Sequence, residues 1–119
     1  PKTIQDHVVP VINEAAEKEN RPKPQVVAAI PVCIHSDKEV ATEYAKRDFG
    51  FYGDLPSYRA MLDREGLENS WDIAITGSFE QVAEGMQEYV DAGATQVVAA
   101  VYGPEESREE TVSRLAELL

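Results

Sequence analysis

The stretch 77–103 (GSFEQVAEGMQEYVDAGATQVVAAVYG) constrains the fold of this chain more than any other. Ser78 and Gln81 have the spacing of a capping box, in which two side chains bond backbone N–H groups at a helix start. Hydrophobic residues then recur at helical steps of three and four: Phe79, Val82, Met86 and Tyr89. Gly93 stands where a helix often ends with a left-handed residue, and 97–102 is an unbroken apolar run, typical of a strand covered on both faces. The stretch therefore predicts the helix-to-strand half of a parallel α/β fold.

A second strand is predicted over 24–34 (PQVVAAIPVCI), which is apolar nearly throughout. Pro31 within it indicates a bulge or a locally unpaired position. The letters QVVAA occur in both predicted strands, which favours a repeated strand–helix architecture, although chance repetition of Val and Ala explains them as well. A short extended piece is expected over 72–76.

Further helices are predicted after Thr3, after Ser36, after Asp54 and after Pro104, where capping residues or acids precede an apolar stripe. Pro10 should kink the first of these helices near His7. The expected inward stripes are Ile4, Val8, Val11 and Ala15 in the first helix and Val112, Leu115, Ala116 and Leu119 in the last.

Composition bounds the class of protein. The chain has 119 residues, enough for one domain, and its 22 acidic and 11 basic side chains give a net charge of −11. Such a surface repels phosphate backbones and anionic lipid, so we expect neither a nucleic acid nor a membrane as partner. The single cysteine, Cys33, lies in an apolar run and is expected to be a buried, inert thiol rather than a nucleophile. One unpaired cysteine, with no membrane-length apolar run, favours a cytoplasmic location.

The two predicted strands look incomplete by themselves. Both are apolar on both faces, and two strands leave two bare edges. The first helix also has no strand before it. We therefore expect residues 1–119 to form one segment of a larger parallel-sheet protein, most simply the C-terminal part of a (β/α)8 barrel of roughly 250 residues or more. A self-contained small α/β domain and an oligomer that completes its sheet between chains are the alternatives.

The order of four segments resembles a known family: 1–17 (PKTIQDHVVPVINEAAE), 24–37 (PQVVAAIPVCIHSD), 51–66 (FYGDLPSYRAMLDREG) and 75–103. They are similar to the C-terminal part of the bacterial luciferase-like monooxygenases. The motif formed by Gly77, Val82, Tyr89 and 92–95 (AGAT) is typical of the wider family. The segment 55–66 (LPSYRAMLDREG) is most similar to the actinobacterial branch of deazaflavin (coenzyme F-420)-dependent oxidoreductases.

The resemblance implies a fold and an activity. Members of this family are TIM barrels, often dimeric, that bind FMN or coenzyme F-420 at the C-terminal mouth and act on a small-molecule substrate. The chain would be roughly the last two strand–helix units, associating with the rest of the barrel. The main catalytic residues would lie outside it, so by itself it would not be a complete enzyme. A non-catalytic α/β module that oligomerises through open sheet edges is the alternative.

One helix start, the end of one strand and one connection are the candidate sites. Lys2 and Thr3 place a cation and a hydroxyl beside free N–H groups, which suits a cofactor phosphate, and the resemblance places a cofactor contact there too. The alternative is a solvated lysine and a simple cap. His35 ends the first strand, where a barrel collects functional groups, and it could donate to a substrate or have no role.

The third candidate is the long connection 35–71, rich in aromatic residues. Tyr52, Tyr58 and Arg59 could cover a flat ring in a substrate pocket, or pack as a satellite core. Tyr102, at the end of the last strand, could face the barrel mouth. The sequence contains no Walker loop, no dinucleotide-binding glycine motif and no cluster with metal-ligand spacing.

Overall fold

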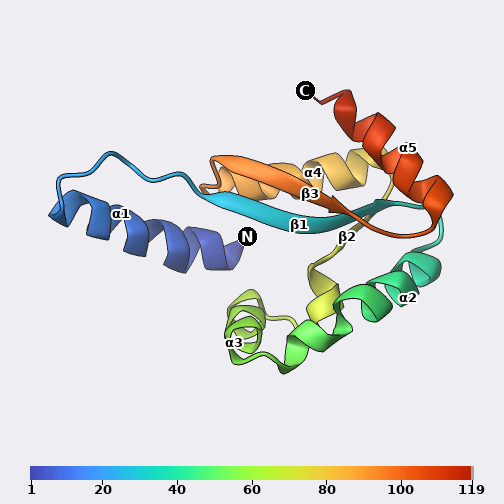
Figure 1. Ribbon diagram of the computed structural model, residues 1–119, viewed down its shortest axis with the longest axis horizontal. Helices are drawn as coiled ribbons and strands as arrows, with labels where there is room; N and C mark the ends of the chain where they lie inside the picture. Colours follow the sequence, from blue (N-terminus) through green and yellow to red (C-terminus); the bar gives the residue numbers. More distant parts are fainter. Residues whose placement is uncertain (119) are drawn as a thin grey trace.

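The computed structural model describes residues 1–118, and its centre is a parallel sheet of three strands (Figure 1). β1 (Val27–Ile34) lies between β2 (Ile75–Gly77) and β3 (Gln96–Val101). β1 pairs with β3 along its length, from Val27↔Gln96 to Val32↔Val101, whereas β2 pairs only with residues 32–34 at its carboxyl end. The prediction of an α/β fold with parallel strands is confirmed, and the expected extended piece near 72–76 contributes β2.

Five α-helices surround the sheet: α1 (Val9–Lys18), α2 (Lys38–Phe49), α3 (Pro56–Glu65), α4 (Phe79–Asp91) and α5 (Glu105–Ala116). A wider π-helical turn, Ile4–Val8, precedes α1, and short 3₁₀ turns, Gly50–Asp54 and Ser70–Ile73, stand before and after α3. In Figure 1 α4 and α5 lie on one side of the sheet and α1, α2 and α3 on the other.

The main core lies between the sheet and helices α4 and α5. Alternate residues of β1 enter it, together with one residue of α4 and one of the turn before β3: Ala28, Ile30, Val32, Ile34, Val82 and Ala94. The local signals seen in the sequence hold α4 in place, because Ser78 and Gln81 form the predicted capping box and Gly93 has a φ of 115°. A Cβ atom at Gly93 would also come within 2.8 Å of Val9 Cγ2, so a side chain there would push α1 away.

The opposite face of the sheet is only partly covered, and here the expectation of strands buried on both faces is wrong. At the carboxyl ends of the strands α2 covers a second small core of Cys33, Ala41, Ala45 and Tyr102. Farther back, Val27 keeps 54% and Val98 44% of its surface exposed. An apolar run shows that a strand has few polar side chains, but it does not decide whether a second layer is present.

The overall shape agrees with a sheet that lacks a layer. The molecule measures 48 × 34 × 17 Å. Its radius of gyration is 15.4 Å, against about 13.5 Å for a compact domain of this length. The larger radius of gyration fits a sheet whose second face is only partly covered.

Pro31 is in register with Ala100 of β3, and only its nitrogen faces an unpaired stretch of strand edge, which is one of the two placements that the sequence indicated. The carbonyls of Val26 and Val32 accept hydrogen bonds from residues at the two ends of β3. The backbone N–H and C=O groups of even-numbered residues in β1 therefore point toward β3. Pro31 therefore directs its nitrogen toward the other edge, where β2 begins to pair only at Val32. The strand continues through Pro31 without a bulge.

In the first helix the predicted inward stripe is wrong after Val8. Val11 and Ala15 are exposed, whereas Val9, Ile12 and Ala16 are partly buried. The reason is the π-helical turn Ile4–Val8, in which Val9 N–H reaches back to Ile4 O and one extra residue enters the helix. Instead of the kink expected from Pro10, the helix has a widened turn, which shifts its buried hydrophobic stripe by one position. Thr3 also makes no side-chain capping bond to this helix.

The last helix is also turned differently from the prediction. Val112 is 58% exposed and Ala116 is exposed, Leu115 reaches the core, and Leu119 lies outside the described residues. The position against β1 belongs instead to Thr111, which is fully buried. Its hydroxyl accepts a hydrogen bond from Ile34 N–H at 3.0 Å and donates to Ser107 O at 2.6 Å. A hydrophobic stripe could not reveal this contact because the residue that makes it is polar.

Two predicted helix caps fall one residue away from the observed ones. The cap of α2 is Asp37, whose carboxylate accepts from Glu39 and Val40, rather than Ser36. The cap of α3 is Leu55 rather than Asp54, because the 3₁₀ turn ends at Asp54 and Pro56 begins the helix. Gly66 ends α3 with a φ of 74°, as expected.

Replacing the hydroxyl of Thr111 with a methyl group should destabilise the fold. In Thr111→Val the buried Ile34 N–H loses its acceptor, so we expect a loss of about 1–3 kcal/mol in the free energy of unfolding, measured by urea denaturation. The control is Val112→Thr, the reverse exchange at the exposed neighbour, which should change stability by less than about 0.5 kcal/mol. Equal effects of the two exchanges would show that the Thr111 bond does not stabilise the fold.

Candidate functional site

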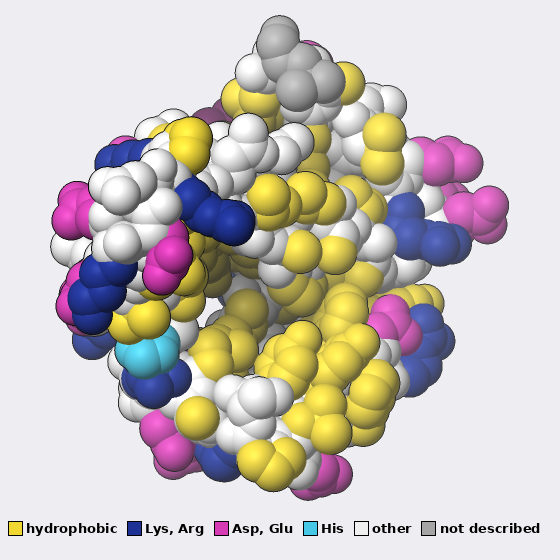
Figure 2. Space-filling model, turned by 60° about the vertical axis from the view of Figure 1, so that its left-hand side comes forward, with side chains coloured by type: hydrophobic (Ala, Val, Ile, Leu, Met, Phe, Trp, Pro, Cys, Tyr) yellow, Lys and Arg dark blue, Asp and Glu magenta, His cyan; other side chains and the backbone are white. Residues whose placement is uncertain are grey.

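A groove of about 500 Å³ runs between the uncovered face of the sheet and the segment that contains α3. Its floor is formed by three small side chains of the strands, Ala29, Pro31 and Ala100. Pro31 and Ala100 are direct neighbours across β1 and β3. Small residues at these positions leave the space above the sheet open, and Figure 2 shows a hollow whose visible walls are mostly hydrophobic.

The opposite wall of the groove consists of aromatic rings. The Tyr52 ring stacks on the Phe51 ring, with centroids 4.2 Å apart, and its centroid is 4.8 Å from that of Tyr58; the planes within each pair are inclined by about 30°. Phe49 and Met61 complete this wall. The structure thus brings the predicted Tyr52 and Tyr58 together on one surface.

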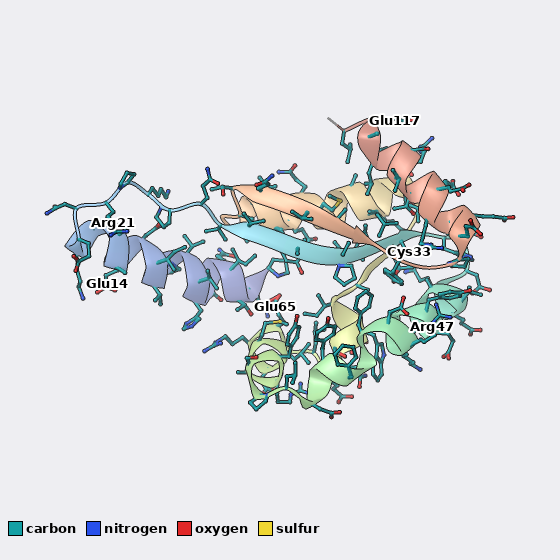
Figure 3. The ribbon with its side chains drawn as sticks, viewed as in Figure 1. Glu14, Arg21, Cys33, Arg47, Glu65 and Glu117 are labelled. Atoms are coloured by element: carbon teal, nitrogen blue, oxygen red, sulfur yellow. The ribbon has the colours of Figure 1, made fainter. Side chains whose placement is uncertain are left out.

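Tyr102 lies next to this wall but in the interior. Only 3% of it is exposed, its hydroxyl is 2.8 Å from Thr76 Oγ1, and its ring meets Phe49 edge-on at 5.5 Å. Burial raises the pKa of Tyr102, although the bond to Thr76 lowers it in part, so the phenol is neutral at physiological pH. Cys33 lies in the same core and is fully buried, which confirms the expectation of a buried thiol, and burial raises its pKa (Figure 3).

His35 lies in a different concavity, on the edge where β1 ends. This concavity holds about 660 Å³ and is shared with Ser78 and Gln81 at the start of α4 and with Arg114 of α5. His35 Nδ1 accepts a hydrogen bond from Asp37 N–H at 2.8 Å, so the proton of the neutral ring is on Nε2. The structure does not bring His35 together with Tyr52 and Tyr58.

Lys2 and Thr3 meet a carboxylate of the chain itself. Glu65, at the end of α3, accepts the N–H groups of Lys2 at 3.2 Å and of Thr3 at 2.6 Å, and the Thr3 hydroxyl at 3.0 Å. The Pro1 amino group also pairs with Glu65, whose side chain is only 8% exposed (Figure 3). An internal anion thus holds the helix start at which the sequence predicted a phosphate.

The charge of Glu65 is stabilised by these contacts. Burial alone would raise the pKa of Glu65, but the bonds from the Pro1 amino group and from Thr3 outweigh it and hold the pKa below its usual value. Nearby, burial and the charges of Glu65 and Glu88 raise the pKa of Tyr89 to about 12. Through its bonds to Lys2 and Thr3, the ionised Glu65 side chain joins α3 to the N-terminal helix.

Arg59 supports a loop and does not line the groove. Its guanidinium donates to Leu67 O at 2.8 Å and Glu68 O at 2.7 Å, and its Nε to Asp63 at 3.2 Å. These bonds fix the chain just after α3. The predicted role of Arg59 in a substrate pocket has no support in this arrangement, and the predictions for Lys2 and His35 stay predictions.

Sequence reasoning missed most of the groove floor and Glu65. Ala29, Pro31 and Ala100 carry no chemical signal, and only their alternation with the core residues of the same strands could have placed them on one face. Glu65 is 62 residues from Thr3, and its neighbours in the sequence are ordinary surface residues. Met61 follows Tyr58 by three residues on α3, so helical spacing did indicate that the two share a face.

Residues 1–118 contain neither a cluster of metal-ligating side chains nor a membrane-spanning helix. Within that range, no three His, Cys, Asp or Glu side chains lie together so that they could hold a metal ion. No helix of the described part is long and apolar enough to cross a membrane. Comparison with protein-family models, with curated protein sequences and with solved structures finds no match.

Neutralising Glu65 should weaken the fold in a pH-dependent way. In Glu65→Gln the bonds from Thr3 lose their charge, so we expect a loss of about 2 kcal/mol in the free energy of unfolding at pH 7. Because the pKa of Glu65 is lowered in the folded chain, its contribution is complete above the unfolded pKa of about 4.3 and is lost as the pH falls below it.

The measurement is urea denaturation of both proteins between pH 7 and pH 3. The difference between wild type and Glu65→Gln should shrink below about pH 4. The exposed Glu84 on α4 offers the control, and Glu84→Gln should follow the wild type at every pH. A constant difference between wild type and Glu65→Gln would rule out this role of the carboxylate.

Proposed function

We propose that this chain belongs to an oxidoreductase of the luciferase-like type, in which coenzyme F-420 or, alternatively, FMN carries the hydride. The one-sided sheet supports the proposal. Helices α4 and α5 cover one face of β1 and β3, while the other face is apolar and largely open. In a (β/α)8 barrel the helices form the outer ring and the other face of each strand lines the interior. The chain would then supply the last two strand–helix units of such a barrel.

The observation that carries the functional part is the position of the groove. Pro31 and Ala100 lie in the carboxyl-terminal halves of β1 and β3, and Tyr52 and Tyr58 belong to the connection that follows β1. Barrel enzymes build their active sites at the carboxyl ends of the strands, from the connections that follow them. A groove formed by small strand residues and an aromatic connection is thus where a substrate pocket is expected.

The residues of this chain would position a substrate and exclude water. The floor of Ala29, Pro31 and Ala100 and the rings of Tyr52 and Tyr58 are surfaces that remove apolar molecules from water. A bound flavin or deazaflavin would supply the hydride chemistry. The Glu65 carboxylate already accepts the backbone N–H groups of Lys2 and Thr3, so a contact with a cofactor phosphate at this helix start would fall to the Lys2 ammonium.

A cofactor titration tests the proposal directly. Coenzyme F-420 and, separately, FMN are added to the protein in its full natural length, and cofactor fluorescence reports binding. We expect saturable binding of one of them at micromolar concentration and none to the urea-unfolded protein. Lack of affinity for both cofactors would refute the proposed function. Lys2→Ala, with Lys18→Ala as an exposed control on α1, tests the predicted phosphate contact: equal binding by both variants would exclude Lys2.

A second candidate function is a non-catalytic module that associates with its own copies. The observation that favours it is the pair of free strand edges, one along β3 and one along the first half of β1, beside exposed Val27 and Val98. Strand edges with unsatisfied N–H and C=O groups pair readily with another chain. Apolar residues next to them would add burial to such a pairing.

Light scattering coupled to size exclusion tests this candidate. If the sheets associate, the 119-residue chain should elute as a dimer or larger, and Val98→Asp should return it to a monomer, because a carboxylate at the contact would be desolvated. Val90→Asp is the matched control, since Val90 is equally exposed, at 46%, but lies on α4. A wild-type monomer at all concentrations would exclude this candidate.

A further inference from the structure

We propose that the groove between the open sheet face and α3 binds a neutral, flat ring molecule that carries a hydrogen-bonding oxygen at its edge. In the oxidoreductase proposed above this would be the substrate class, and to that extent the inference rests on the proposed function. The volume of about 500 Å³ is in the range of small-molecule sites, which run from about 300 to 1,000 Å³.

The neutrality of the ligand follows from the lining of the groove. Charged side chains make up 28% of this chain, yet none of them lines the groove. An ionised ligand would lose water there without gaining a counter-charge, which is costly in an apolar site. The net charge of −11 disfavours anions further.

A cation is also disfavoured, although aromatic rings can bind one. Cation binding needs an open ring face directed at the charge. Tyr58 offers a partly exposed ring, but no carboxylate lines the groove to replace the water that a cation would lose. Arg47, which does bind a ring face, lies over Tyr44 outside the groove.

The flatness of the ligand follows from the two walls. The floor of Ala29, Pro31 and Ala100 has no long side chains, so it presents the even surface of a sheet. Tyr58 is the outer member of the ring stack and is 38% exposed, so a further ring can stack against it. A planar molecule presents a full face to an aromatic ring or an even floor, whereas a puckered one presents a smaller contact area.

The polar edge follows from the two phenols. Within residues 1–118 the Tyr102 hydroxyl bonds to Thr76, whereas the hydroxyls of Tyr52 and Tyr58 make no such bond. Each can donate to or accept from a carbonyl or hydroxyl group. Ser70, which also lines the groove, is already engaged with Phe49 O at 2.7 Å.

The experiment is a fluorescence titration of naphthol into the 119-residue chain, whose fold is checked by circular dichroism. Three relatives of this probe separate the features of the ligand. Naphthalenesulfonate has the same rings with a negative charge, N-methylquinolinium has a positive charge, and decahydronaphthol has the hydroxyl on a puckered skeleton. Decahydronaphthol is not fluorescent, so its binding is measured by displacement of naphthol. We expect naphthol to bind roughly tenfold more tightly than each of the three, which corresponds to about 1.4 kcal/mol.

Variants locate the binding site. Ala100→Leu fills the groove from its floor and should weaken naphthol binding by roughly tenfold or more, while its exposed position leaves the core intact. Tyr58→Phe keeps the ring but removes the hydroxyl, and should weaken binding about fivefold. Ala60→Leu is the control, because Ala60 is exposed on α3 and does not line the groove.

The outcomes are distinct from those of the cofactor titration. Naphthol binding that is lost in Ala100→Leu and kept in Ala60→Leu supports the inference even if neither cofactor binds. No naphthol binding, or equal binding of a charged relative, overturns it whether or not a cofactor binds. The inference also fails if light scattering shows a dimer that Ala100→Leu dissociates, because the groove would then receive a second copy of the chain.

Discussion

The parallel pairing of β1 with β3 is the constraint on which the rest of the structure depends. It places Ala28, Ile30 and Val32 on one face, where α4 and α5 bury them, and Ala29, Pro31 and Ala100 on the other. Since side chains alternate along a strand, a strand that is apolar throughout must present a second hydrophobic face. The covered face gives the chain its core, and the uncovered face gives it a surface with which to bind.

What lies over the second face differs along the strands. At the carboxyl ends α2 packs its alanines onto Cys33 and Tyr102 and closes a small core. Just behind it the connection turns at Gly50 and Gly53 and sets the ring stack of Tyr52 and Tyr58 at a distance from the sheet. The groove is the space left between the uncovered sheet face and the connection with the aromatic rings. Its walls are largely apolar because both surfaces consist mainly of hydrophobic residues.

Electrostatics inside the chain set a limit on where anions can bind. Helix starts attract negative charge, and a free one invites a phosphate. The N-terminal helix instead receives the carboxylate of Glu65, which joins it to α3. Because Glu65 occupies these N–H groups, they stabilise the fold and are not free to bind an external anion. The uncharged groove is therefore the better candidate for a ligand site.

The sequence by itself determined the local elements. The capping box at Ser78, the end of α4 at Gly93 and the parallel strands follow from patterns among neighbouring residues, and all are present. The contact between Tyr52 and Tyr58 could also be predicted from the sequence, because the two residues lie only six positions apart. Only the tertiary structure decided which strand face is covered, that Thr111 rather than Val112 meets β1, and that Glu65 holds Thr3. These depend on contacts between residues far apart in the chain, where hydrophobicity and spacing carry no information about the partner.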